Sequence, residues 1–319
     1  MPLTFDQITA ITNELYLPKF PQLFADMNLL QKRCHAKGSK PQGGEQIKQH
    51  VFYQQNKGGF YSEYDTFDIS AEEQITAAFW SWRFLEIPIT LSRSDVLRNA
   101  GPPAVKSLMD AKMKGAAIRA SQLLAQGFFG TGNDSTVAIN SIDNMVDDGT
   151  TLQASATFGG ISKTDNSWWA GNTHTGAGAA TSYALMSIAE AKVVDGNIRP
   201  TIWEMHPETF SAYMRENQPD QRYMKQDEMD AGFRTASFNG RTVVADRYVP
   251  DGADAANRIY GLNEDFIDLV THSDENMRLE PFAKPVDQAV IVGHIMWAGN
   301  LTSSDPSRHV AIHNFENTT

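Results

Sequence analysis

The side chains that most often carry out chemistry form no recognisable catalytic or metal-binding group in this sequence. His309 and His313 are four residues apart, a spacing that would place two metal ligands on one face of a helix. Residues 308–315, however, alternate between apolar and polar types as a strand does, and no HExxH motif is present. The pair therefore does not predict a metal site.

Three other groups are better explained by turns, helix ends or packing. Residues 127–132 are rich in glycine, but they follow a helical pattern, whereas a phosphate-binding loop precedes a helix. Asp143, Asp147 and Asp148 lack the spacing and the distal glutamate of a calcium loop. Cys34, the only cysteine, has no context that suggests a nucleophile. We therefore predict no catalytic, cofactor or metal site, and a protein that is not an enzyme.

The composition is that of a folded, acidic protein. Of 319 residues, 41% are hydrophobic and 20% are charged, and the formal net charge is −11. Nucleic-acid-binding proteins usually carry an excess of Lys and Arg that neutralises phosphates, and this chain has the opposite excess. No apolar run approaches the roughly 20 residues that span a bilayer, and the N-terminus lacks a secretory signal. We expect no membrane segment and no tight grip on nucleic acid.

The most distinctive feature is a concentration of aromatic residues between positions 46 and 92. Its members are Phe52, Tyr53, Phe60, Tyr61, Tyr64, Phe67, Phe79, Trp80, Trp82 and Phe84. Ile87, Ile89 and Leu91 alternate with other residues as in a half-buried strand. An isolated hairpin is at best marginally stable in water, so it cannot bury such rings alone. We expect an extended β-hairpin over 46–92 whose rings contact neighbouring subunits.

Two further expectations concern this hairpin. The turn could lie at 57–59 or at 70–73; the second position is preferred, with Gly58 and Gly59 in a bulge. Replacing Trp80 and Trp82 by Ala is expected to leave a soluble subunit that assembles poorly.

The rest of the chain predicts one long helix and a mixed α/β part. Apolar residues recur at steps of three and four over 103–127, between Pro102 and Gly127. Further elements are predicted as helices at 5–15, 183–194 and 207–217, and as strands at 201–205, 241–249, 277–282, 286–297 and 308–315. Residues 289–297 are apolar on both faces, as expected for a central strand.

The order of these elements resembles the major capsid protein of tailed bacteriophages, which has the HK97-like fold. Three parts of the chain add sequence likeness: 77–83 with 87–92 and 95–99; 159–162 with 167–170; and 202–207 with Tyr213 and 238–241. The ordered set covers essentially the whole chain.

The resemblance implies an α+β fold with defined parts. These are an N-terminal arm (1–45), an extended hairpin or E-loop (46–92), a P-domain spine helix (93–134), an inserted A-domain (135–274) and a C-terminal P-domain sheet (275–319). A loop at 216–233 would face the capsomer axis.

The same resemblance implies a structural role in a virion. The chain would self-assemble, in the host cytoplasm, into hexamers and pentamers of an icosahedral head that encloses double-stranded DNA without sequence-specific binding. A portal would be one partner. A separate scaffolding protein would be another, because the 45 residues before the hairpin are too few for the long fused scaffolding segment that some members carry.

Two alternatives remain. An encapsulin-type nanocompartment shell shares this fold and encloses protein instead of DNA. A soluble enzyme would need a site assembled from dispersed residues such as Trp203, His206 and Asp246. Some members of the capsid family also join subunits through Lys–Asn bonds, and Lys57 and Asn300 are residues of those types, although the sequence does not fix their geometry.

Overall fold

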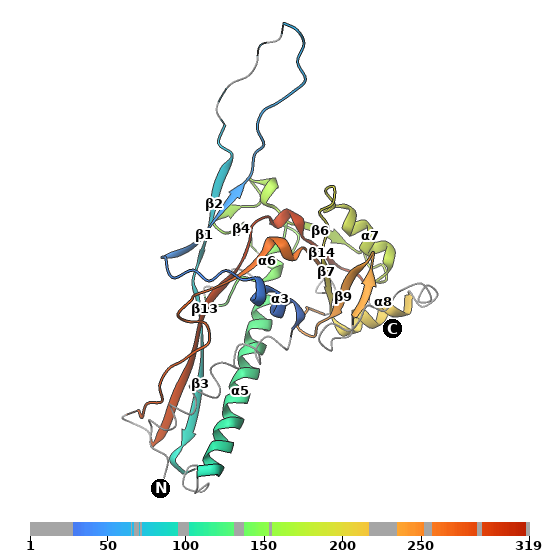
Figure 1. Cartoon of the computed structure of the whole chain (residues 1–319). Helices are drawn as coiled ribbons and strands as arrows, with labels where there is room; N and C mark the ends of the chain where they lie inside the picture. Colours follow the sequence, from blue (N-terminus) through green and yellow to red (C-terminus); the bar gives the residue numbers. More distant parts are fainter. Residues whose placement is uncertain are drawn as a thin grey trace.

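The computed structural model describes residues 28–64, 66, 70, 72–94, 102–130, 137–152, 155–216, 235–251, 257–285 and 289–316. The predicted helix over 5–15, Phe67 and most of the predicted loop at 216–233 lie outside these ranges. The molecule is elongated: a two-stranded arm leaves one end, a long helix runs beside a long sheet, and an α/β lobe projects from the side (Figure 1).

The long sheet is organised around β13 (Val290–Ser303). β3 (Arg83–Ser92) pairs antiparallel with it from Val290↔Ser92 to Gly299↔Arg83. On the opposite edge lie β11 (Ile267–Thr271) and β12 (Arg278–Leu279). The prediction of a central strand over 289–297 is therefore confirmed, because other strands pair with both edges of β13.

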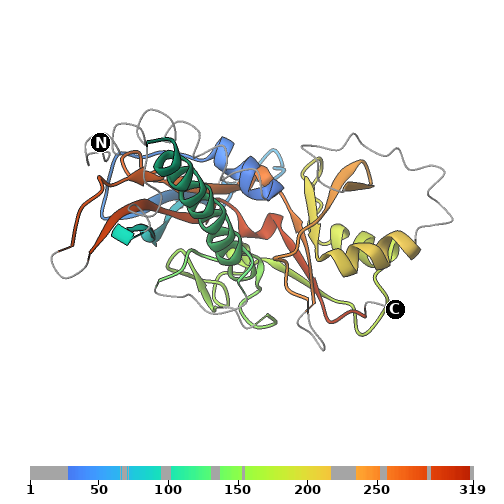
Figure 2. The ribbon, with the colours of Figure 1, turned by 90° about the horizontal axis from the view of Figure 1, so that it is seen from below.

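Helix α5 (Pro102–Phe128) runs along β3 and crosses this sheet, as Figures 1 and 2 show. Its 27 residues correspond to about 40 Å at 1.5 Å per residue. The buried side chains recur at helical spacing: Met109, Met113, Ala116, Ala117, Ala120 and Leu124. The helix continues one residue beyond Gly127, where a Cβ would lie 2.6 Å from Ile139 Cγ1. Gly127 therefore permits close packing as well as marking the helix end.

The lobe contains a six-stranded sheet in the order β6-β14-β10-β7-β9-β8. Its strands are β6 (Asn172–Thr175), β14 (Val310–His313), β10 (Arg258–Leu262), β7 (Ile202–Met205), β9 (Arg241–Ala245) and β8 (Thr235–Phe238). Two helices pack on it, α7 (Tyr183–Ala191) against β14 and α8 (Pro207–Glu216) against β9. Because β13 and β14 follow one another in the chain, the C-terminal segment ties the lobe to the long sheet.

Five short elements link these parts. They are α3 (Leu29–Lys37), α6 (Ile142–Val146), and the β4 (Thr157–Phe158) and β5 (Ile161–Ser162) hairpin with the 3-10 turn at Ser167–Trp169. Helix α3 packs on β11 at the junction between sheet and lobe.

The paired part of the arm is shorter than the predicted 46–92. β1 (Gln46–Phe52) pairs with β2 (Ile75–Ser81) from Gln46↔Ser81 to Phe52↔Ile75, whereas β3 pairs with β13 instead. The described residues 53–64 and 72–74 continue from the paired strands as a loop that extends away from the body (Figure 1).

The predicted turn at 70–73 is wrong. The chain turns at Glu63–Tyr64, and Lys57 Nζ lies 3.0 Å from Glu72 Oε1 across the arm. Register is set by the stem, where Ile47 and Val51 must face inward, because a slip of one residue would turn every side chain to the other face. The polar residues at 70–73 therefore do not mark the position of the turn.

Trp80 fixes the arm to the body of its own subunit. Its ring, 4% exposed, packs edge-on against Phe158 with the ring centroids 5.6 Å apart. A Cβ on Gly159, which has φ +59°, would come within 2.8 Å of Trp80 Cζ2. The Phe79 backbone N–H also donates to Gly159 O at 2.9 Å. Trp80 thus contributes to the subunit fold, which corrects the expectation that its loss would affect assembly alone.

This packing predicts different effects for two adjacent aromatic residues. Trp80→Ala should lower the free energy of unfolding by about 3 kcal/mol, because it leaves a cavity beside Phe158. Phe79→Ala, on the exposed face of the same strand, should cost less than about 1 kcal/mol. Urea unfolding of the unassembled subunit, followed by circular dichroism, measures both. Equal losses in the two variants would contradict the assigned anchoring role.

Candidate functional site

The arm presents exposed aromatic rings on a segment that projects from the body. The exposed rings on the arm are Phe52, Phe60, Tyr61, Tyr64 and Phe79, and Phe84 is exposed on β3, which pairs with β13 in the long sheet. Tyr64 lies in the turn at Glu63–Tyr64 and Phe60 lies shortly before it, and both side chains are fully or almost fully exposed. Large apolar side chains gathered on a projecting element mark a surface that another molecule covers.

Three of the predicted contact residues instead face their own chain. Trp80 is buried, as described above. Tyr53 packs against Trp168, with ring centroids 5.2 Å apart, and Trp82 packs against His272 at 5.3 Å. Trp82 Nε1 also donates to Gly44 O at 2.8 Å. The sequence pattern did not separate these anchoring rings from the outward ones.

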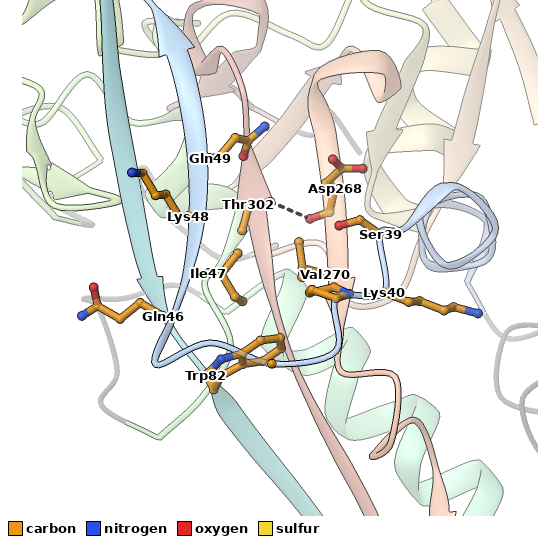
Figure 3. Close-up of a pocket in the computed structure, with 12 residues that line it drawn as sticks. Ser39, Lys40, Gln46, Ile47, Lys48, Gln49, Trp82, Asp268, Val270 and Thr302 are labelled. Carbon is orange, nitrogen blue, oxygen red and sulfur yellow. Dashed lines mark hydrogen bonds between the residues drawn. The ribbon is translucent and has the colours of Figure 1, made fainter.

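A groove lies at the base of the arm, beside Trp82 (Figure 3). Its volume is about 570 Å³, and Ile47, Trp82 and Val270 form its apolar part. The residues that complete the lining are Ser39, Lys40, Pro41, Gly43, Gln46, Lys48, Gln49, Asp268 and Thr302. One wall is the loop after α3, which is held in place because the backbone N–H groups of Thr271 and Ser273 donate to Ser39 O and Pro41 O. The groove is therefore lined by the loop after α3, by the base of the arm and by the long sheet, at the point where the arm leaves the body.

Asn300, considered above for a Lys–Asn bond, is a buried structural residue. Its Nδ2 donates to Ser81 O at 3.0 Å, and its Oδ1 accepts from the backbone N–H groups of Asn140 and Leu301, each at 2.9 Å. The amide is 1% exposed, so it ties the end of β2 to β13. Lys57 forms its ion pair with Glu72 on the arm.

Acidic side chains are buried at the junction between α3 and the lobe. Glu204 is fully buried, and neither carboxylate oxygen has a hydrogen-bond partner within the described residues. Burial, with Asp246 and Glu264 nearby, raises the pKa of Glu204 well above its usual range. Burial also raises the pKa of Asp246, opposed by the Tyr248 N–H and the Asn28 amide. Burial therefore favours the protonated form of Glu204 more strongly in the folded chain than in the unfolded chain.

The residues of the enzyme alternative do not share one exposed cleft. Trp203 lies in the lobe core, edge-on to Phe238 at a centroid distance of 5.4 Å. His206 and Asp246 follow the parallel strands β7 and β9, whose pairing at Met205↔Ala245 places them at the same sheet edge. His206 Nδ1 lies 2.6 Å from Asp251 Oδ2. The sequence thus indicated the proximity of His206 and Asp246 but missed Asp251.

His309, excluded above as a metal ligand, has a structural role. It is fully buried; its Nδ1 accepts from the Asn263 backbone N–H at 3.1 Å, and its Nε2 lies 3.4 Å from Ser303 Oγ. Burial lowers the pKa of His309 to about 3, so the ring is neutral in the folded chain.

Within the described residues, no helix is both long and apolar enough to cross a bilayer.

Comparison with known proteins identifies the fold through structure alone. No family model matches the sequence, and no curated protein matches it. The capsid asymmetric unit of cyanophage A-1(L) superposes with a TM-score of 0.63 at 15% identity, over 93% of each chain. The capsid of the native GTA particle gives 0.62 at 13% identity, over 89% of this chain and 90% of that one.

A third solved structure comes from a different kind of particle. The holo-SrpI encapsulin complex from Synechococcus elongatus PCC 7942 gives a TM-score of 0.52 at 9% identity, over 76% of this chain and 78% of that one. At these identities the likeness shows the fold, and the predicted α+β, HK97-like fold is confirmed.

The buried Glu204 carboxyl predicts a specific pH dependence. Because the pKa of Glu204 is raised in the folded state, the protonated Glu204 side chain contributes to stability near pH 4. This contribution is lost as the pH rises above the usual pKa of a glutamate. Glu204→Gln keeps the shape and removes this proton linkage. The free energy of unfolding of Glu204→Gln should therefore change less between pH 5 and 8 than that of the wild type. The two pH slopes should differ by up to about 1.4 kcal/mol per pH unit.

Thermal unfolding from pH 4.5 to 8 measures this difference. Glu216→Gln, at the exposed end of α8, is the control and should follow the wild-type profile. Parallel profiles for wild type and Glu204→Gln would show that Glu204 is ionised in the folded chain.

Proposed function

We propose that this chain, which has the HK97-like fold, is the major capsid protein of a tailed bacteriophage. The observation that carries the proposal is the fold itself, matched over nine tenths of the chain by phage capsid subunits of nearly the same extent. The exposed arm supports it, because a shell subunit needs surfaces that are completed by its neighbours rather than a catalytic cleft.

In this role the arm would provide contacts between subunits. Burying a few hundred Å² of its aromatic surface contributes several kcal/mol per contact at about 25 cal/mol per Å², offset in part by the cost of ordering the loop. Symmetry repeats each contact around a closed shell, so individually modest contacts give a stable assembly. The residues proposed for this contact are the outward rings: Phe52, Phe60, Tyr61, Tyr64, Phe79 and Phe84.

The remaining parts have distinct roles in this proposal. Residues 1–45 act as the N-terminal arm, 46–92 as the E-loop, 93–134 and 275–319 as the P-domain, and 135–274 as the A-domain. Helix α5 and β13 support a rigid P-domain, and β3, the last part of the E-loop range, joins the E-loop to it by pairing with β13. The net charge of −11 supports a shell that encloses DNA without gripping it, since an attractive wall would impede packaging.

We further propose the assembly that such a subunit serves. Hexamers and pentamers close into an icosahedral head in the host cytoplasm, with a separate scaffolding protein and a portal as partners, and the chain remains in the virion.

An encapsulin-type shell is the second candidate, because the SrpI encapsulin complex shares the fold. The capsids of cyanophage A-1(L) and of the native GTA particle match more of the chain and superpose more closely than the encapsulin does, which favours the capsid. The contents of the particle separate the two functions.

Electron microscopy of the purified recombinant chain, alone and co-expressed with the genes adjacent to its own, tests the proposal. We expect closed polyhedral particles, or rings that close only with a co-expressed partner. Packaged nucleic acid would identify a capsid, and packaged protein an encapsulin. Small discrete oligomers under every condition would contradict both functions.

The arm contact predicts a separation between folding and assembly. Phe60→Ser combined with Tyr64→Ser should leave the unfolding midpoint within about 2 °C of wild type, because both rings are exposed. The yield of particles should fall at least tenfold, as measured by sedimentation. Val137→Ser, an exposed apolar residue outside the arm, is the matched control and should assemble normally. Normal particles from the double variant would exclude the arm tip as a contact.

A further inference from the structure

Three side chains of metal-ligand type converge where β7 ends and α8 begins. A ring nitrogen of His206, a Glu208 carboxylate oxygen and an Asp251 carboxylate oxygen all lie within 4.8 Å of one another. His206 and Glu208 come from the corner before α8, and Asp251 comes from the segment between β9 and β10. The group thus joins two segments of the lobe that are far apart in sequence.

The backbone holds two of these ligands in place. His206 O accepts from the Phe210 N–H at 2.8 Å, in the first turn of α8. Pro207 restricts the backbone between His206 and Glu208. The Arg258 N–H donates to Pro250 O at 3.1 Å, which fixes the residue before Asp251.

The charges of this group favour a cation. Two carboxylates and one imidazole converge, and Asp246 lies close enough to interact electrostatically with His206. The imidazole side chain is 21% exposed and that of Asp251 is 13% exposed, so both are partly removed from water. Like charges in such a setting repel one another more strongly than at an open surface.

We propose that His206, Glu208 and Asp251 bind one divalent transition-metal ion of the Zn²⁺ class. One imidazole and two carboxylates form a ligand set that suits Zn²⁺, with ligand distances of about 2.0–2.2 Å. Glu208 is exposed, so its side chain can close the short remaining gap, and water completes the coordination. The ion would clamp the segment around Asp251 to the start of α8.

A competing explanation is that Glu208 and Asp251 only stabilise the N-terminus of α8, where carboxylates are favoured. That explanation predicts no bound ion. Isothermal titration of the tag-free, EDTA-treated chain with ZnCl2 separates the two, and it can be performed on unassembled subunits. It therefore does not depend on the proposed shell function.

We expect one Zn²⁺ site per chain and an increase in the unfolding midpoint when it is filled. Asp251→Asn and Glu208→Gln preserve shape and should each weaken Zn²⁺ binding at least tenfold. His206→Ala should abolish binding. His294→Ala is the matched control, because His294 Nδ1 pairs with Glu86 Oε1 at 2.7 Å without belonging to the three-ligand group.

Three results would overturn the proposal. The first is the absence of saturable Zn²⁺ binding by the wild-type chain, and the second is Zn²⁺ binding that persists in Asp251→Asn and Glu208→Gln. The third is that His294→Ala weakens Zn²⁺ binding as much as Asp251→Asn and Glu208→Gln do. Circular dichroism of each variant confirms that it is folded, and the two isosteric variants decide the question if His206→Ala is not.

Discussion

A two-stranded arm has two faces, and only one of them can pack on its own subunit. In this chain Ile47, Val51 and Trp80 point inward and are buried, while Phe52 and Phe79 point outward and are exposed. Alternation along a strand makes this division unavoidable once the register is set. The arm is therefore anchored by one set of rings and presents another set for contact. The proposed assembly depends on this separation.

The body of the molecule provides the rigid support that an anchored arm requires. β3 continues from the arm after Trp82 and pairs along ten residue positions with β13, and α5 lies along the same strand. β13 then leads to β14 in the lobe. Force applied to the arm would thus pass directly into the long sheet, and through β13 into the lobe. Asn300 reinforces this path, because its side-chain amide connects β13 to the end of β2.

The junction beneath α3 is the least typical part of the core. Glu204 is buried without a hydrogen-bond partner in the described part of the chain, while Asp246 is held by Asn28 and the Tyr248 N–H. Buried unpaired carboxyls cost stability unless they are protonated. The attachment of α3, which supplies Asn28 as its N-cap, is therefore linked to the protonation of residues in the lobe. The neighbouring His206 cluster adds a second electrostatic constraint at the same sheet edge.

The sequence by itself determined the long helix, the central strand over 289–297 and the order of elements that indicates the HK97-like fold. These features come from the local residue pattern, which a helix or a central strand imposes on its own residues. Only the tertiary structure decided the turn at Glu63–Tyr64, the pairing of β3 with β13, and the division of the arm's rings into anchors and exposed surface. Aromatic residues look alike in a sequence whichever face they occupy. Likewise, Asp251 meets His206 and Glu208 only because the parallel pairing of β7 and β9 brings distant segments to one edge. Contacts between residues far apart in the chain leave no local pattern, and the packing of the whole chain sets them.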